Sequence, residues 1–270
     1  WKRRASLADL DDAAPCANHL VEIGLLTRWQ AHKLIEGRHR GFFLGNYKLL
    51  NHLGTGGMSS VYLAEHVRLR RPAAIKILPH RRAHDQNYLE RFQVEGRAIA
   101  ALDHPNIVRV YDLDDDGSLH YLVMEYIEGR DLAHVVEMQG PLEFHLAADY
   151  CAQAAAGLGH AHSVGLVHRD IKPANLLVDL KGTVKILDMG LAKFTGDAAD
   201  LASDQVVGTA DYLAPEQAKN SHEVDHRADI YSLGCSLHYL LTGRPPYSGA
   251  TLMAILLKHR DGEIPLLRAA

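Results

Sequence analysis

The sequence predicts an α+β fold in which a small antiparallel sheet with one helix precedes a mostly helical region. Between residues 46 and 125, strand-like runs such as YKLLNHLG, SSVYLAEHV and PAAIKILP are separated by glycine or polar turns. DQNYLERFQVEGRAIAALD has helical periodicity, and IVRVYDLDDDGSLHYLVMEY has the pattern of a hairpin that turns at DDDG. We therefore expect three parts: a short helical segment over residues 1–45, a sheet-based region over 46–128 and a helical region over 129–270.

Helix signals support the first and third parts. AAPCANHLVEIGLL and TRWQAHKLIEG predict two short amphipathic helices joined at Gly24, with Thr27 as an N-cap and Gly37 as a stop. They are too short to bury a core alone, so we expect them to pack against another part or to belong to a larger N-terminal module. DLAHVVEMQ predicts a short helix, LEFHLAADYCAQAAAGLGHAHSVG predicts a long, buried one, and HRADIYSLGCSLHYLLTG predicts another apolar helix.

Composition and charge argue against several classes of protein. Lys and Arg number 29 against 33 Asp and Glu, a net charge of -4, which does not suit nucleic-acid binding through bulk charge. Cys16, Cys151 and Cys235 have no C-x-x-C spacing and predict reduced thiols in a cytoplasmic protein. No apolar run approaches the ~18–20 residues of a membrane span, and no signal-peptide pattern is present. Because the chain begins with Trp1, we expect a fragment, and membrane anchoring would require segments outside it.

The sequence contains 18 histidines, of which His160 and His162 form an H-x-H pattern. On a helix these two positions do not share a face. No Cys or carboxylate stands beside them at metal-ligand spacing. We therefore expect surface histidines of a helix rather than a metal site.

A glycine-rich turn with Gly54, Gly56 and Gly57 lies between two predicted strands. Because a strand follows it and not a helix, it does not match a dinucleotide-binding or Walker loop. Glycines in such a hairpin allow backbone amides to approach phosphate groups, although glycine turns are also common in ordinary hairpins.

Lys76 is the single charge inside the apolar run AAIKIL. A strand lysine is commonly a surface residue whose stem covers apolar groups. Here the apolar neighbours on both sides indicate that its own face is turned to a cleft. A buried ammonium requires an anionic partner, and Glu95 in the following helix is the candidate.

The span GLVHRDIKPANLL places polar groups between apolar runs, as in a loop held at both ends that faces a cleft. The Asp170 carboxylate can accept a proton from an attacking hydroxyl, and Lys172 can neutralise a phosphoryl group. The oxygens of Asn175 and of Asp188, in the run ILDMG, suit Mg2+. Together these residues indicate metal-assisted phosphoryl transfer.

AAIK, HRDIKPAN, DMG, GTADYLAPE and DIYSLGC occur in the order and spacing of the protein-kinase signature. Residues 46–261 therefore resemble a protein kinase, and specifically the bacterial eukaryotic-like Ser/Thr kinases. The resemblance implies a bilobal fold, with an N-lobe over 46–128 and a C-lobe over 129–270 that lacks the family's final helices. It also implies a cytoplasmic domain that transfers the γ-phosphoryl group of ATP to Ser or Thr of a protein, with Mg2+ or Mn2+. No nucleic-acid partner is expected, and a dimer would allow autophosphorylation.

The resemblance assigns a role to each motif residue. Asp170 would be the catalytic base, Lys172 would steady the transferred phosphoryl group, and Asn175 and Asp188 would bind the metal. Lys76, paired with Glu95, would hold the α- and β-phosphates. The other nucleotide contacts would come from the glycine-rich turn, the adenine pocket, the gatekeeper Met124 and the hinge: Leu53, Gly54, Thr55, Gly56, Gly57, Met58, Ser59, Val61, Ala74, Met124, Glu125, Ile127 and Leu177.

The resemblance also implies positioning and regulatory roles. Asp229 would brace the loop that contains His168, Arg169 and Asp170, here called the HRD loop, and Thr209 would contact it. Arg169 beside the catalytic base suggests control by phosphorylation of the activation loop, with Ser203 as the acceptor, although Ser203 is equally read as an ordinary solvated serine. In the family, Glu216 pairs with an Arg beyond residue 270, so we expect this chain to expose apolar surface and to be less stable than a full domain.

Two positions depart from the family pattern. Ser59 stands where a glycine is usual, which weakens phosphate approach without preventing it. Met189 replaces a phenylalanine, and we expect it to pack with His168, Ile99 and Val110 because Met can fill the same apolar space.

Three other functions stay open at this point. A pseudokinase or scaffold would share the fold but lack turnover. A small-molecule phosphotransferase would share the HxD and metal-carboxylate elements but not GTADYLAPE. Residues 1–45 alone fit a structural, docking or targeting module.

Overall fold

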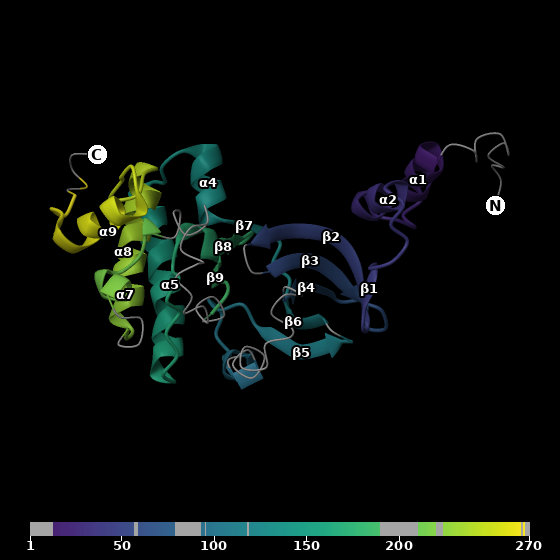
Figure 1. The fold of residues 1–270 in the computed structure, drawn as a ribbon, viewed down its shortest axis with the longest axis horizontal. Coiled ribbons are helices and arrows are strands. Elements are labelled where there is room, and N and C mark those ends of the chain that lie inside the picture. The colour runs from purple at the N-terminus through teal and green to yellow at the C-terminus, as the bar shows by residue number, and fades with distance from the viewer. Residues whose placement is uncertain are drawn as a thin grey trace. The chain divides into compact units, whose positions relative to one another are not determined.

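The computed structural model describes residues 13–56, 59–78, 93–94, 96–117, 119–189, 210–219, 224–265 and 267. The chain forms two compact units, one of residues 1–84 with 111–126 and the other of residues 85–110 with 127–270. The first is built on a sheet and the second is mostly helical (Figure 1), so the predicted α+β class is confirmed.

The first unit contains a six-stranded sheet in the order β1-β2-β3-β4-β6-β5. The pairs β1–β2, β2–β3, β3–β4 and β4–β6 are antiparallel. The strands predicted from YKLLNHLG, SSVYLAEHV and PAAIKILP and from the DDDG hairpin are all present. The six strands are β1 (Phe43–Leu44), β2 (Tyr47–Gly56), β3 (Ser59–His66), β4 (Pro72–Ile77), β5 (Val110–Asp116) and β6 (Leu119–Glu125).

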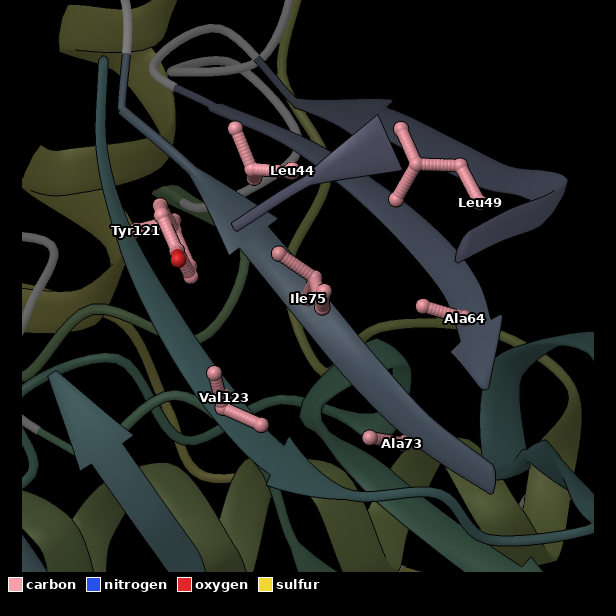
Figure 2. Close-up of a cluster of buried hydrophobic side chains, with 7 residues drawn as sticks. All are labelled: Leu44, Leu49, Ala64, Ala73, Ile75, Tyr121 and Val123. Carbon is pink, nitrogen blue, oxygen red and sulfur yellow. The ribbon is translucent and has the colours of Figure 1, made fainter. Parts of the chain in front are cut away.

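A hydrophobic cluster covers one face of this sheet. Alternation along the strands directs every second side chain to that face, while their neighbours, such as Leu63, Ala74 and Leu122, lie on the opposite face. Figure 2 shows the seven buried members of the cluster: Leu44, Leu49, Ala64, Ala73, Ile75, Tyr121 and Val123.

In the described part of the first unit, the helices α1 (Ala13–Glu22) and α2 (Arg28–Ile35) precede the sheet. The N-cap predicted at Thr27 is confirmed, and it is part of a capping box with Gln30. Gly24 and Gly37, at the ends of the helices, have φ of 74° and 80°, which favours glycine. The side chain of Trp29 packs against the hydrophobic cluster of the sheet, so the expectation that this segment packs on another part is confirmed.

The second unit contains the predicted helices and a small sheet in the order β7-β8-β9. Asp131 caps α4 by accepting a hydrogen bond from the His134 N–H, and Gly243, in the left-handed region, ends α8. The elements are β7 (Gly129–Asp131), α4 (Leu132–Gln139), α5 (Phe144–Ser163), the 3-10 turn η2 (Pro173–Asn175), β8 (Leu176–Asp179), β9 (Val184–Ile186), α7 (Pro215–Lys219), α8 (Arg227–Thr242) and α9 (Leu252–Asp261).

Helix α5 is amphipathic and not buried all round. Its buried side chains recur every three or four residues, as Ala147, Cys151, Ala154, Leu158 and Ala161. The expectation of a buried helix is therefore wrong for the opposite face, where Asp149, Ala152 and Ala156 are exposed. Across the described ranges, none of the helices combines the length and the apolar content needed to cross a membrane.

Candidate active site

His168 ties the HRD loop to the segment that follows β9. The imidazole is buried, its Nδ1 accepts a hydrogen bond from the Asp170 N–H at 3.2 Å, and its Nε2 lies 2.7 Å from the Leu187 carbonyl oxygen. Since Nδ1 acts as an acceptor, the ring proton is on Nε2, which donates to Leu187. One neutral histidine therefore links the residue proposed as catalytic base to the residue before Asp188.

Asp229 of α8 braces the same loop from a fully buried position. Its Oδ1 accepts from the Arg169 N–H at 2.7 Å, and its Oδ2 accepts from the His168 N–H at 2.8 Å. These bonds hold Arg169 at a φ of 66°, in the left-handed region. The bracing role expected for Asp229 is confirmed.

His162 completes the set of donors to Asp229, with its Nε2 2.8 Å from Oδ2. The expectation of a surface histidine is wrong for His162, because its side chain is only 15% exposed and is held by a buried carboxylate. His160 lies on another side of α5, where its ring stacks on that of His104.

Asp170, Lys172 and Asn175 converge within this loop. The Lys172 ammonium lies 3.0 Å from Asp170 Oδ2. The Asn175 amide nitrogen donates to Asp170 Oδ2 at 3.0 Å and to the Asp170 backbone oxygen at 2.7 Å. Two donors from different residues therefore orient a carboxylate that is only 13% exposed.

The β8–β9 hairpin brings Asp188 to the end of the same loop. Leu176 pairs with Ile186, and the Leu187 N–H donates to the Asn175 carbonyl oxygen at 2.9 Å. Asp188 follows directly and has a φ of 56°, a left-handed conformation that Asp adopts more readily than most residues. The hairpin thus places the backbone positions of the two expected metal ligands, Asn175 and Asp188, side by side.

The chemistry of this pair suits a hard cation. Because the Asn175 amide nitrogen points to Asp170, its oxygen is directed elsewhere, as metal ligation requires. Among the described residues there is no cluster of three or more His, Cys, Asp or Glu side chains that would hold a metal by itself. A carboxylate with an amide oxygen is instead the kind of set that Mg2+ uses together with phosphate oxygens and water.

Gln217 of α7 is a residue that the sequence reasoning missed. Its amide nitrogen donates to the Arg169 carbonyl oxygen at 2.9 Å, and its amide oxygen accepts from the Ala214 N–H at 3.1 Å. One side chain thereby joins the HRD loop to the APE segment. Its place directly after APE is the only signal in the sequence, because neither periodicity nor spacing marks it.

Met189 is buried in the second unit, as are its expected neighbours His168, Ile99 and Val110. Burial agrees with the expectation that Met fills the space of an aromatic ring, while its packing against these three side chains stays a prediction.

The strand register of the first unit places four expected nucleotide-binding residues on one face. Val61 pairs with Lys76, and Ala74 pairs with Met124. Directly paired residues lie on the same face, and so do Ala74 and Lys76, which are two positions apart. These four side chains therefore share the face opposite the hydrophobic cluster, which explains how a lysine fits within an apolar strand.

The described residues of the glycine-rich hairpin lie at the end of β2 and the start of β3. Gly54 pairs with Val61 and Gly56 with Ser59. Leu53 lies at a register shift between His52 and Gly54, and its side chain is 45% exposed. The Thr55 hydroxyl lies 2.9 Å from His52 Nε2.

Several other residues to which the sequence assigned a role do not belong to this sheet face or lie outside the described residues. Glu125 ends β6 in the first unit, whereas Ile127 and Leu177 belong to the second. Gly57, Met58, Glu95, Ser203 and Thr209 lie outside the described residues, so the Lys76–Glu95 pair stays a prediction.

The family model for the protein kinase domain matches residues 47–266. The chain belongs to the protein kinase family. Membership implies the use of ATP and of a divalent metal. The match begins after α2, so α1 and α2 lie outside it.

Similar proteins include bacterial Ser/Thr kinases. The kinase is 42% identical over 221 residues to the serine/threonine-protein kinase PrkC of Bacillus subtilis, covering 82% of this chain and 34% of that protein. It is 41% identical over 226 residues to the serine/threonine-protein kinase PknB of Mycobacterium tuberculosis, covering 81% and 36%. The chain thus spans about a third of the length of these curated relatives.

A solved structure supports the fold. A crystal structure of the Mycobacterium tuberculosis PknI kinase domain, in a variant with a single substitution, matches with a TM-score of 0.65 and 28% sequence identity. The match covers 85% of this chain and 82% of that one. The kinase fold expected from the sequence is therefore confirmed.

Proposed function

We propose that this domain transfers the γ-phosphoryl group of MgATP to Ser or Thr hydroxyls of protein substrates. The observation that carries the proposal is the convergence of Lys172 and Asn175 on the Asp170 carboxylate. Held by these donors, Asp170 would accept the proton of the incoming hydroxyl, and Lys172 would offset charge on the transferred group. A lysine at this position, and the printed names of the relatives, favour Ser/Thr over Tyr as the acceptor.

Asn175 and Asp188 would hold Mg2+, or Mn2+ in its place, which when bound offsets the negative charge of the phosphates. On the first unit, Lys76 would hold the α- and β-phosphates, with Glu95 as its partner. The remaining nucleotide contacts would come from the glycine-rich turn 53–59, from Val61, Ala74 and Met124 on the shared sheet face, and from Glu125, Ile127 and Leu177.

Activation-loop phosphorylation would regulate this reaction. The Arg169 Nε is buried and has no hydrogen-bond partner among the described residues, so its guanidinium suits a phosphate supplied by the loop. Ser203 is the proposed acceptor, and a dimer would allow one copy to phosphorylate another. Mass spectrometry after incubation with ATP tests this, since full activity with unmodified Ser203 would exclude the switch.

A cytoplasmic location is proposed for the domain. All three cysteines are free thiols, as a reducing compartment allows, and ATP is supplied there. Any membrane anchor would belong to other segments. Cell fractionation with an antibody to this domain tests the location.

Phosphate transfer from MgATP to a Ser/Thr-containing protein, compared between wild type and Asp170→Asn, tests the function. We expect Asp170→Asn to lose about 10²–10⁴-fold in kcat and to keep nucleotide binding, because the general base is lost and not the nucleotide contacts. Asp149→Asn, an exposed carboxylate on α5, is the matched control and should keep full activity. Intact turnover in Asp170→Asn, or phosphotyrosine as the product, would contradict the proposal.

A further inference from the structure

The helices that precede the kinase match belong to the same compact unit as the sheet. Trp29 of α2 lies edge-on to Tyr62 of β3, with ring centroids 5.8 Å apart, and edge-on to Phe42 at 5.9 Å. It also packs against the hydrophobic cluster that includes Leu49 (Figure 2). Since edge-to-face ring pairs add to the energy of burial, α2 is held on the sheet by specific packing.

β2 is irregular at the place where α2 meets it. Its register with β3 shifts between Leu49 and Asn51 and again between His52 and Gly54, so Leu50 and Leu53 are extra residues relative to β3. Extra residues of this kind bend a strand and increase its twist. The two shifts therefore determine the direction in which β2 continues toward the glycine-rich hairpin.

Two side chains of the α2 segment bind the backbone at the first shift. The Thr27 hydroxyl donates to the Leu50 carbonyl oxygen at 2.5 Å, and the Gln30 amide nitrogen donates to the Leu49 carbonyl oxygen at 2.6 Å. Gln30 is 1% exposed, so its amide depends on these partners in place of water.

The same two side chains form the capping box of α2. The Thr27 hydroxyl accepts from the Gln30 N–H at 3.2 Å, and the Gln30 side-chain oxygen accepts from the Thr27 N–H at 2.9 Å. Each side chain therefore stabilises the start of the helix and tethers β2 at once. Two hydrogen bonds within the capping box and two hydrogen bonds to β2 therefore share the same pair of side chains.

The hydrogen bonds from Thr27 and Gln30 to β2, here called the tether, lie on the edge of β2 that faces away from β3. β1 pairs with Tyr47 and Lys48, and the Leu49 N–H donates to the Phe42 carbonyl oxygen, which shows that Leu49 presents its backbone away from β3. At Leu49 and Leu50 the α2 segment takes the place of β1, since its side chains bond the two carbonyl oxygens. Covering a strand edge with a helix satisfies carbonyl groups that the neighbouring strand does not use.

We propose that α2 sets the bend of β2 and thereby positions the glycine-rich hairpin for nucleotide binding, with Thr27 and Gln30 as positioning residues. The hairpin residues Gly54 and Gly56 follow Leu50 on the same strand, so a change in the bend is carried directly to them. The inference rests on the proposed role of this hairpin in holding ATP phosphates.

Substitutions at Thr27 separate the tether from the cap. Thr27→Asp keeps a good N-cap acceptor for the Gln30 N–H but cannot donate to Leu50, whereas Thr27→Ser keeps both bonds and is the matched control. We expect Thr27→Asp to raise the KM for MgATP about threefold to tenfold, the effect of one hydrogen bond, with kcat and the KM for a peptide substrate unchanged. Thr27→Ser should behave as wild type.

A second variant covers the case in which Thr27→Asp does not fold. Gln30→Glu keeps the capping-box acceptor, since Glu is a usual residue at this position, but removes the donor to Leu49. It should weaken binding of a non-hydrolysable MgATP analogue, measured by calorimetry, in the same direction as Thr27→Asp.

The outcomes distinguish the inference from the proposed function. Wild-type affinity for the analogue in both Thr27→Asp and Gln30→Glu would overturn the inference alone, as would a lower kcat at unchanged KM for MgATP. Wild-type protein that does not bind the analogue at all would overturn the proposed function and the inference with it.

Discussion

Asp229 shows how one buried residue controls the backbone of the catalytic loop. A carboxylate removed from water is costly unless charge-assisted hydrogen bonds replace its hydration. Here two backbone N–H groups and His162 do so. The loop in turn depends on the carboxylate, since the left-handed conformation of Arg169 costs about 1–2 kcal/mol and needs local bonds to persist.

Asp229→Ala should therefore lower both stability and activity. It leaves the His168 and Arg169 N–H groups without their acceptor, and we expect a loss of about 2–4 kcal/mol in the free energy of unfolding, measured by urea denaturation. The kcat for phosphate transfer should fall as well, because Arg169 directly precedes the proposed base. The control is Asp103→Ala, an exposed carboxylate paired with Arg109, which should keep the wild-type midpoint. Equal midpoints for the two variants would argue against this role.

Helix α5 illustrates how close packing at one position determines the placement of an element. It contacts β9, the strand that leads to Asp188, and a Cβ added at Gly157 would lie 2.9 Å from Ile186 Cδ1 and 3.0 Å from the Asn106 carbonyl oxygen. Gly159, two residues further on, is exposed, and a Cβ there would meet nothing within 4 Å. The two glycines share a helix but differ in what surrounds them.

Alanine at these two positions should have opposite effects. Gly159→Ala should stabilise the domain by about 0.5–1 kcal/mol, because alanine favours the helix and space is available. Gly157→Ala should destabilise it by about 1–2 kcal/mol, because overpacking against Ile186 and Asn106 outweighs the same helical gain. Urea denaturation of both variants provides the comparison. If Gly157→Ala were as stable as Gly159→Ala, the close approach of α5 to β9 would not be a constraint.

At the scale of the whole molecule, burial makes stability depend on pH, because it raises the pKa of several thiols and phenols of the second unit. Burial raises the pKa of the Cys151 thiol to about 11 and that of Cys235 to about 12, and it also raises the pKa of the Tyr212 and Tyr231 phenols. Each of these groups keeps its proton in the folded chain at a pH where the unfolded chain has released it. Their contribution to stability is therefore present below the unfolded pKa and is lost as the pH rises.

The domain should accordingly become less stable above about pH 8.5, the pKa of an unfolded thiol. Between that pH and about 11, the folded state binds more protons than the unfolded state, so each buried thiol costs about 1–2 kcal/mol by pH 10. Urea denaturation at pH 7.5 and pH 10 should show a smaller loss for Cys151→Ala than for wild type. The same loss in both proteins would mean that Cys151 does not contribute.

Much of this domain was predictable from its sequence. Local patterns predicted the strands of the sheet, the helices α4, α5 and α8 and the cap at Thr27, because period, capping and turn residues act within a few positions. They did not predict that His162 is held by Asp229, that Gln217 joins two motifs or that α5 has an exposed face, because these depend on contacts between distant segments.

The sequence by itself determined the family and the identity of the chemical groups, since ordered motifs such as HRDIKPAN and GTADYLAPE are a property of residue order. Only the tertiary structure decided which atoms those groups meet: that Lys172 and Asn175 converge on Asp170, and that Val61, Ala74, Lys76 and Met124 share one sheet face. It also decided that Thr27 and Gln30 hold β2. The physical reason is that hydrogen bonds and strand register join residues far apart in the chain, and a local pattern carries no information about the partner.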